Sequence, residues 1–125
     1  MRSAVESFVE RIRHGGQEAS YVDFVHGVLG DDEVLAIADA IGSSSCLQNL
    51  FLGMASISKD QASLIASRGF RRNRSLRKVR LAGEIETDGL KEILQAFDDR
   101  RTGPVHLLAY ADFVSMRFSL GLMNR

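Results

Sequence analysis

The side chains that most often catalyse reactions or bind metals are few and scattered in this 125-residue chain. The three histidines, His14, His26 and His106, lie far apart, and none has the short spacing to a second ligand that zinc sites show. Cys46 has no histidine placed to activate it as a nucleophile. Because unactivated cysteines usually behave as small apolar residues, we interpret Cys46 as a structural thiol.

Two acidic pairs, Asp31-Asp32 and Asp98-Asp99, have the side chains of catalytic carboxylates. The first pair begins a predicted helix, where carboxylates oppose the positive end of the helix dipole, and the second lies at a solvated helix end. No glycine-rich phosphate loop or metal-binding motif accompanies them. We therefore expect a protein that is not an enzyme and that has no cofactor, no metal site and no small-molecule substrate.

Cationic side chains are concentrated in one short stretch of the chain. Its members are Arg68, Arg71, Arg72, Arg74, Arg77, Lys78 and Arg80. Guanidinium groups pair bidentately with carboxylate and phosphate, so the stretch predicts a basic patch for an acidic protein or for RNA. Phe70 is its one aromatic residue, which gives weak support to base stacking. The alternative is that these cations are solvated or stabilise a helix C-terminus.

The composition is that of a globular protein, with 45% hydrophobic and 26% charged residues and a formal net charge of zero. No apolar run approaches the roughly 18 residues that a membrane span needs, and no secretory signal is recognisable. A single cysteine excludes an internal disulfide. These features predict an intracellular, cytoplasmic protein, in which the sequon at Asn73 is a chance match.

An internal repeat organises the chain. Residues 47–52, 76–81 and 105–110, with a degenerate copy at 19–24, carry apolar residues at their first, fourth and sixth positions. The copies begin at Ala19, Leu47, Leu76 and Val105 and are almost equally spaced. Because strand side chains alternate between two faces, each copy predicts a short strand with one buried face.

Amphipathic helices are predicted between these strands, since apolar residues recur there at helical intervals. The residues of these stripes are Val34, Leu35, Ile37, Ala38, Ile41, then Leu64, Ile65, Phe70, and then Leu90, Ile93, Leu94, Phe97. Ser58 or Asp60 is expected to cap the second helix and Thr87 or Asp88 the third. Gly42 is expected to end the first.

Both ends of the chain are predicted to be helical caps. Ser3 and Glu6 have the spacing of a capping box, and an apolar helical face follows. At the other end, a final helix is predicted from Phe113, Met116, Arg117, Leu120 and Met123. Such caps cover the apolar core of terminal repeats. We predict one domain over 1–125, with a cap helix at 1–16, repeats at 19–46, 47–75 and 76–104, and a last strand and cap helix at 105–125.

This pattern resembles the ribonuclease-inhibitor-like leucine-rich-repeat family over residues 19–113. A further apolar residue near position eleven (Leu29, Ile57) belongs to the likeness. The family usually has Asn or Cys at position nine, where this chain has Gly27, Ala55 and Glu84, and the third repeat is one residue short. The resemblance implies an α/β solenoid with a parallel concave sheet of about four strands and outer helices.

The end of the chain is also similar to the tropomodulin and leiomodin repeat domain. The likeness lies in residues 107–113 and 122–125. It implies a capped repeat fold and, as a weaker alternative function, an actin filament cap.

Side chains between the buried strand positions are predicted to line the concave face. They form two rows, Tyr21, Asn49, Lys78, Leu107 and Asp23, Phe51, Arg80, Ala109. Such a mixture of aromatic, acidic and basic groups is typical of a protein-binding patch. The alternative is an ordinary solvated sheet face. We predict a scaffold module that binds another protein in a larger complex, through the concave face and the arginine-rich edge. An RNA- or nucleoprotein-associated subunit is the alternative.

Overall fold

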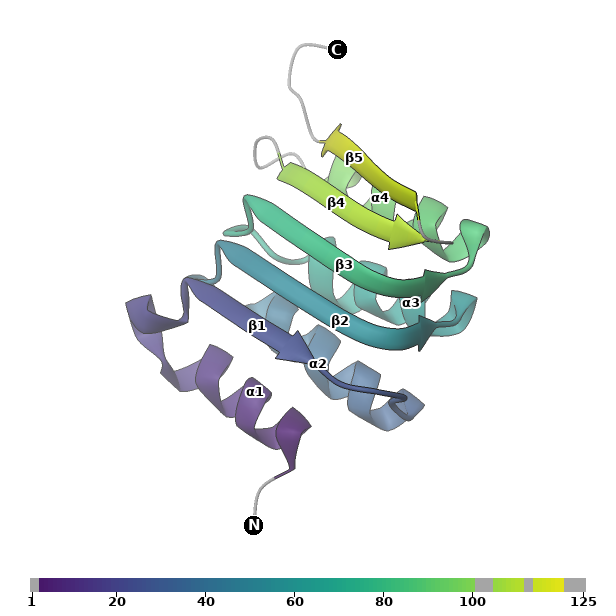
Figure 1. Cartoon of the computed structure of the whole chain (residues 1–125). Coiled ribbons are helices and arrows are strands. Elements are labelled where there is room, and N and C mark those ends of the chain that lie inside the picture. Colours follow the sequence, from purple (N-terminus) through teal and green to yellow (C-terminus); the bar gives the residue numbers. More distant parts are fainter. Residues whose placement is uncertain (1–2, 101–104, 112–113, 121–125) are drawn as a thin grey trace.

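The computed structural model describes residues 3–100, 105–111 and 114–120, and shows a mixed α/β fold (Figure 1). The five-stranded sheet runs in the order β1-β2-β3-β4-β5, parallel through β4 and antiparallel at β5. The strands are β1 (Tyr21–Val25), β2 (Asn49–Ile57), β3 (Lys78–Ile85), β4 (Val105–Ala111) and β5 (Val114–Leu120). The helices are α1 (Ala4–His14), η1 (Gly16–Ala19), α2 (Asp31–Ser43), α3 (Lys59–Leu64), η2 (Ile65–Phe70) and α4 (Thr87–Asp99).

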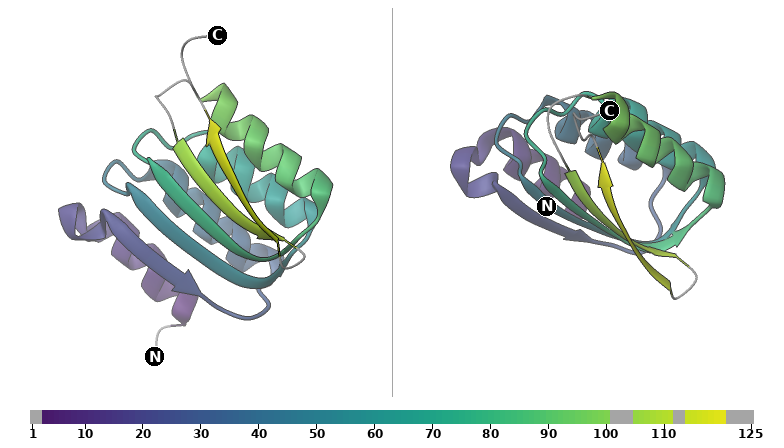
Figure 2. Two further views of the ribbon diagram at one scale, coloured as in Figure 1. Left: turned by 45° about the horizontal axis from the view of Figure 1, so that its top comes forward. Right: turned by 90° about the horizontal axis from the view of Figure 1, so that it is seen from above.

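The helices form one layer over a single face of the sheet (Figure 2). We call the opposite face, which no described helix covers, the open face. Parallel neighbours need a crossover between them, and α2, the α3–η2 helix and α4 provide these crossovers on the same side. Among the described residues, no helix is long and apolar enough to span a membrane.

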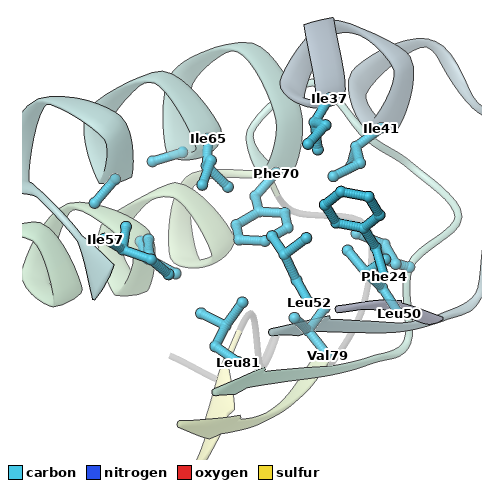
Figure 3. Packing of buried hydrophobic residues seen from close by; sticks show 14 of the residues in the cluster. Phe24, Ile37, Ile41, Leu50, Leu52, Ile57, Ile65, Phe70, Val79 and Leu81 are labelled. Atoms are coloured by element: carbon cyan, nitrogen blue, oxygen red, sulfur yellow. The ribbon is translucent and has the colours of Figure 1, made fainter. Parts of the chain in front are cut away.

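The core lies between the two layers. Alternate strand residues point into it, such as Leu50 and Leu52 of β2, and the side chains of the helices meet them there (Figure 3). Phe70 and Phe97 stack with their ring centroids 4.6 Å apart, and both are fully buried. Burying one such side chain contributes roughly 1.5–3 kcal/mol. The predicted buried positions of the first three strand segments are confirmed, since each of these side chains is buried.

Helix starts follow the predicted capping in part. Ser3 Oγ accepts a hydrogen bond from the Glu6 amide at 3.1 Å, and Ser58 caps α3 in a reciprocal box with Gln61. The prediction for α4 is wrong, because its N-cap is Glu86 and both Thr87 and Asp88 lie inside the first turn. The Glu86 carboxylate instead accepts a hydrogen bond from the Lys59 amide at 2.6 Å, which ties α4 to α3.

Gly42 does not end α2, as its type had suggested, because the helix continues to Ser43. A Cβ atom at Gly42 would lie 2.1 Å from the Arg68 carbonyl oxygen, so the glycine is where the η2 backbone approaches α2. The approach coincides with a π-helical turn, in which the Arg71 amide bonds to the Ala66 carbonyl at 2.9 Å. Tertiary packing, rather than helix termination, explains why position 42 is a glycine.

The shortening of the third repeat appears in the structure as an irregularity between β2 and β3. Gly53 pairs with Ala82 and Ser56 with Glu84, so β2 carries one residue more than β3 in this interval. Gly83 faces the extra residue with φ +124°, and a Cβ there would overlap the Met54 carbonyl oxygen. Only glycine fits both the backbone conformation and the space.

The predicted C-terminal cap helix is wrong, because residues 114–120 form β5, paired antiparallel with β4. Met116 and Phe118 are half-buried against the core, while Arg117 is exposed between them. This alternation is that of a strand, and it outweighs the helical spacing because β5 satisfies the free edge of β4. Phe113 and Met123, which were part of the helix prediction, lie outside the described residues.

The register predicted for the fourth strand is also wrong, by one position. Tyr21 pairs with Asn49, Asn49 with Lys78, and Lys78 with His106, where Leu107 had been expected. A shift by one position turns every side chain to the other face of a strand. Leu107 is therefore buried rather than exposed on the open face, and so is Ala109.

Candidate functional site

The open face carries all six side chains that were predicted to bind a partner. The strand register aligns them, together with residues of β4 and β5, in two rows across the sheet. The rows are Tyr21, Asn49, Lys78, His106, Ser119 and Asp23, Phe51, Arg80, Leu108, Arg117. The sequence-based rows missed the last two members of each. His106 and Leu108 follow from the corrected register of β4, and Ser119 and Arg117 follow from the pairing of β5 with β4.

Arg80 links three strands on this face. Its Nη2 donates a hydrogen bond to the Tyr21 hydroxyl at 2.9 Å, and its guanidinium carbon lies 4.8 Å from the centroid of the Phe51 ring. We call Tyr21, Phe51 and Arg80 the central cluster. A cation over an aromatic ring at an exposed site contributes about 0.5–1 kcal/mol, and together with the hydrogen bond to Tyr21 it favours the orientation in which Arg80 covers part of the Phe51 ring. Tyr21 nevertheless stays 46% exposed.

An apolar side chain extends the central cluster toward the end of β1. Val25 is 72% exposed although it is a large apolar residue, and Val28, in the loop that follows β1, is 76% exposed. A Cβ atom at Gly53 would lie 3.2 Å from Phe51 Cε1 and 3.5 Å from Val25 Cγ2, so the ring and the valine both overhang this glycine. The β1 side of the open face is thus apolar around Phe51, with Asp23 as its acidic member.

A hollow of about 500 Å³ lies on the other side of the central cluster, over β3, β4 and β5. Lys78, His106 and Arg117 line it, and none of the described residues that line it is acidic. The His106 ring nitrogen Nδ1 and the Ser119 hydroxyl are 3.3 Å apart and share a hydrogen bond. The hollow is the cationic end of the open face.

The structure does not bring the seven predicted cations together on one surface. Arg68 pairs with Asp39 of α2 at 3.7 Å, and Arg71 pairs with Asp99 of α4 at 3.3 Å. These two pairs join helices of the outer layer, whereas Lys78 and Arg80 lie on the open face. Arg74 donates to the Arg100 carbonyl at 3.3 Å, and Arg72 and Arg77 are exposed.

Sequence analysis missed a buried polar network around Asn73, whose side chain is fully buried. Its amide donates to the Ile41 carbonyl at 2.8 Å, and its Oδ1 accepts from the amides of Ser75 and Leu76 at 2.8 and 2.7 Å. Asn73 therefore joins the end of α2 to the turn before β3. A fully buried side chain is not a glycosylation acceptor in the folded chain, so the role of Asn73 in this sequon is structural.

Arg100 completes this network from the end of α4. The residue is 4% exposed, and its guanidinium donates to the Asn73 carbonyl at 3.2 Å and to the Leu76 carbonyl, while Nε has no described partner. Burial, and then the charge of Arg74, lower the pKa of Arg100 to about 10. The side chain therefore remains charged at neutral pH and is a structural cation that anchors the β3 turn.

The remaining chemical candidates stay apart. His26 stacks on Phe24 with centroids 5.9 Å apart, and His14 lies at the end of α1. Cys46 is half-buried, with its sulfur 3.9 Å from the Ser45 hydroxyl. Within the part of the chain that the structure describes, no three histidine, cysteine, aspartate or glutamate side chains are grouped to hold a metal ion.

No family model matches the chain, and no curated protein matches its sequence. Solved structures with a similar fold include domains of leiomodin-1 and of tropomodulin. Actin-binding site 2 of leiomodin-1 superimposes with a TM-score of 0.69 at 15% identity, over 86% of this chain and 61% of that one. The tropomodulin C-terminal domain of Caenorhabditis elegans gives 0.62 at 17% identity, over 89% and 65%.

The chain thus spans somewhat less than two thirds of either neighbour. At these identities the likeness shows the fold, which is a mixed α/β arrangement with a mostly parallel five-stranded sheet. It confirms, at the level of fold, the resemblance to the tropomodulin and leiomodin repeat domain. Part of the sequence that suggested it, at residues 112–113 and 122–125, lies outside the described residues. Similarity to the ribonuclease-inhibitor-like family stays a prediction. The chain has the fold of the leiomodin and tropomodulin domains.

Proposed function

We propose that this chain is a non-catalytic module that binds another protein through the open face of its sheet, inside an intracellular complex. The central cluster carries the proposal. Tyr and Arg are among the residue types most enriched at the energetic centres of protein interfaces, and here they are held together before any partner arrives. A preordered contact group loses less conformational entropy on binding.

The surroundings of the central cluster support the same function. Exposed Val25 offers apolar area beside Phe51, and Asp23 and Lys78 place opposite charges at the margin. An apolar centre with a polar rim is the usual anatomy of a protein interface. Arg68 and Arg71 of the helix layer pair with carboxylates, which speaks against one continuous RNA-binding patch.

A double variant, Phe51→Ala with Arg80→Glu, tests this function. The purified chain is immobilised and used to capture proteins from its native cells, and the recovery of each captured protein is quantified. We expect at least about tenfold lower recovery of the specific partner, because the variant removes two central contacts. A matched control, Leu35→Ala with Lys91→Glu, makes similar changes on the helix layer and should leave recovery unchanged. Equal recovery by all three proteins would remove the open face as the binding surface.

Actin binding is a second candidate, favoured by the structural similarity to actin-binding site 2 of leiomodin-1. That domain is named for its target, and this chain covers 61% of it. Co-sedimentation with filamentous actin and pointed-end elongation assays test the idea directly. Sedimentation of this chain together with filamentous actin, and slower filament elongation at the pointed end in its presence, support actin binding. An unaffected elongation rate contradicts it.

We further propose that the strand–helix units are leucine-rich repeats of a short solenoid. The nearly equal spacing of the parallel strands supports this, as do the crossover helices on one side. The lost position-nine Asn or Cys marks a divergent array, in which Asn73, in the turn before β3, provides a turn-stabilising side chain instead.

A further inference from the structure

The hollow over β3, β4 and β5 has an apolar floor and cationic walls. Leu108 of β4 is half-buried at its base, and it pairs with Arg80 on one side and with Arg117 on the other. In the adjacent row, Lys78 and His106 lie side by side. At about 500 Å³, the hollow has the size of a ligand-binding cleft.

The position of Arg80 keeps this hollow open. Its guanidinium group leans across β2 to reach the Tyr21 hydroxyl on β1, and so it turns away from Leu108. If Arg80 extended over β4 instead, it would cover the floor. The central cluster therefore shapes the hollow beside it.

The cations of the hollow have no acid to neutralise them in the part of the chain that is described. Lys78 and Arg117 are both exposed, and neither side chain has a described hydrogen bond or ion pair. The ion pairs of Arg68 with Asp39 and of Arg71 with Asp99 lie in the helix layer instead. Because the formal charge of the whole chain is zero, this positive potential is a local property of the open face.

We propose that this hollow binds an extended acidic peptide segment of the partner protein, with carboxylates against Lys78 and Arg117 and an apolar side chain on Leu108. The inference rests on the proposed function and names the chemistry of the partner. An acidic peptide fits better than a nucleic acid because the side chain at the base of the hollow is the aliphatic Leu108, whereas single-stranded nucleic acids use aromatic platforms on which bases stack. Lysine and arginine pair well with carboxylates, and the apolar floor suits a leucine-sized side chain.

Fluorescence anisotropy with synthetic peptides tests the proposal on the full chain at low ionic strength. The probe is a labelled octapeptide of alternating Glu and Leu, and its counterpart with Gln in place of Glu removes the charge. We expect the acidic peptide to bind at least about tenfold more tightly than the neutral one. The variant Lys78→Gln with Arg117→Gln should weaken binding of the acidic peptide by roughly threefold to tenfold, because both exposed carboxylate partners are lost.

A control variant separates this site from general charge. Arg11→Gln with Lys91→Gln removes the same two charges from exposed positions of α1 and α4, and binding should stay within about twofold. Circular dichroism checks that both variants are folded. Equal weakening in the two variants, or no binding of the acidic peptide to the unmodified chain, overturns the proposal. Tighter binding of a uridine oligonucleotide that is lost in the Lys78 and Arg117 variant also overturns it.

The test is separable from that of the proposed function. If the peptide fails to bind while partner capture still requires Phe51 and Arg80, the acidic-peptide site is wrong and the open face remains the binding surface. If the peptide binds as expected but partner recovery is unchanged in the Phe51 and Arg80 variant, the acidic-peptide site is supported. The central cluster is then not the centre of the interface.

Discussion

At the residue scale, two side chains hold the turns that precede the inner strands. Ser44 Oγ accepts from the amides of Cys46 and Leu47 before β2, and Asn73 Oδ1 accepts from the corresponding amides before β3. Asn73 also donates to the Ile41 carbonyl, and thereby links two successive repeats. Buried amides and carbonyls without partners are costly, so these side chains replace the hydrogen bonds that the turns lack.

The substitution Asn73→Ala tests this role. It leaves the amides of Ser75 and Leu76 without their acceptor and removes one of the two donors to the Ile41 carbonyl, so we expect the free energy of unfolding to fall by about 2–4 kcal/mol. Urea unfolding followed by circular dichroism measures the change. Asn49→Ala, on the open face, should change stability by no more than about 0.5 kcal/mol. Similar small effects at both positions would contradict the structural role of Asn73.

Among the strands and helices, two features depart from a regular repeat: the irregular pairing of β2 with β3 and the antiparallel strand β5. The extra residue of β2 opposite β3 is accommodated because Gly83 adopts a backbone conformation that L side chains rarely take. The end of the sheet is completed by β5, which pairs with β4 and turns Arg117 to the hollow. Both features shape the open face: the first alters the pairing of β2 with β3, and the second provides the far wall of the hollow.

Gly83→Ala is expected to lower the free energy of unfolding by at least about 2 kcal/mol, because its Cβ would overlap the Met54 carbonyl and its φ is +124°. Gly27→Ala is the matched control, since a Cβ there meets nothing within 4 Å. It should leave stability within about 0.5 kcal/mol or raise it slightly. Thermal or urea unfolding of the two variants compares them, and an equal effect would show that the β2–β3 irregularity is not as described.

At the scale of the whole molecule, one buried cluster runs from α1 to β4. Phe8 of α1 contacts Phe24 of β1 with ring centroids 4.9 Å apart, and Phe70 and Phe97 stack at the other end. The open face is divided in the same direction, with apolar side chains near β1 and cations over β3 to β5. The core thus supports a surface with two chemically different halves.

A continuous core predicts cooperative unfolding. Phe8→Ala and Phe97→Ala remove buried rings from opposite ends of the cluster, and each should lower the free energy of unfolding by about 3–5 kcal/mol. Each variant should still unfold in a single transition, detected at the same midpoint by far-ultraviolet circular dichroism and by tyrosine fluorescence. Two separated transitions in either variant would show that the ends unfold independently. Val28→Ala, at an exposed position, is the control.

The sequence pattern correctly predicted the alternation of strands and helices as far as β4, together with the buried positions of β1, β2 and β3. This was possible because hydrophobic periodicity reports which side of an element is buried. It also placed Tyr21, Phe51 and Arg80 on one face, since side chains alternate along a strand. It did not reveal their mutual contacts, which depend on the rotamer of Arg80.

The register of β4 and the strand at the C-terminal end follow from tertiary contacts and not from local sequence. A stretch such as Leu107-Leu108 is apolar at two successive positions, so its pattern does not say which residue faces the core. Pairing with β3 settles that choice, because Lys78 aligns with His106. The residues around Met116 fit a helical stripe in sequence, and they form a strand because β4 offers an unpaired edge. The local spacing of apolar residues predicts a secondary-structure element, and hydrogen bonding to a neighbouring strand determines which of its side chains face the core.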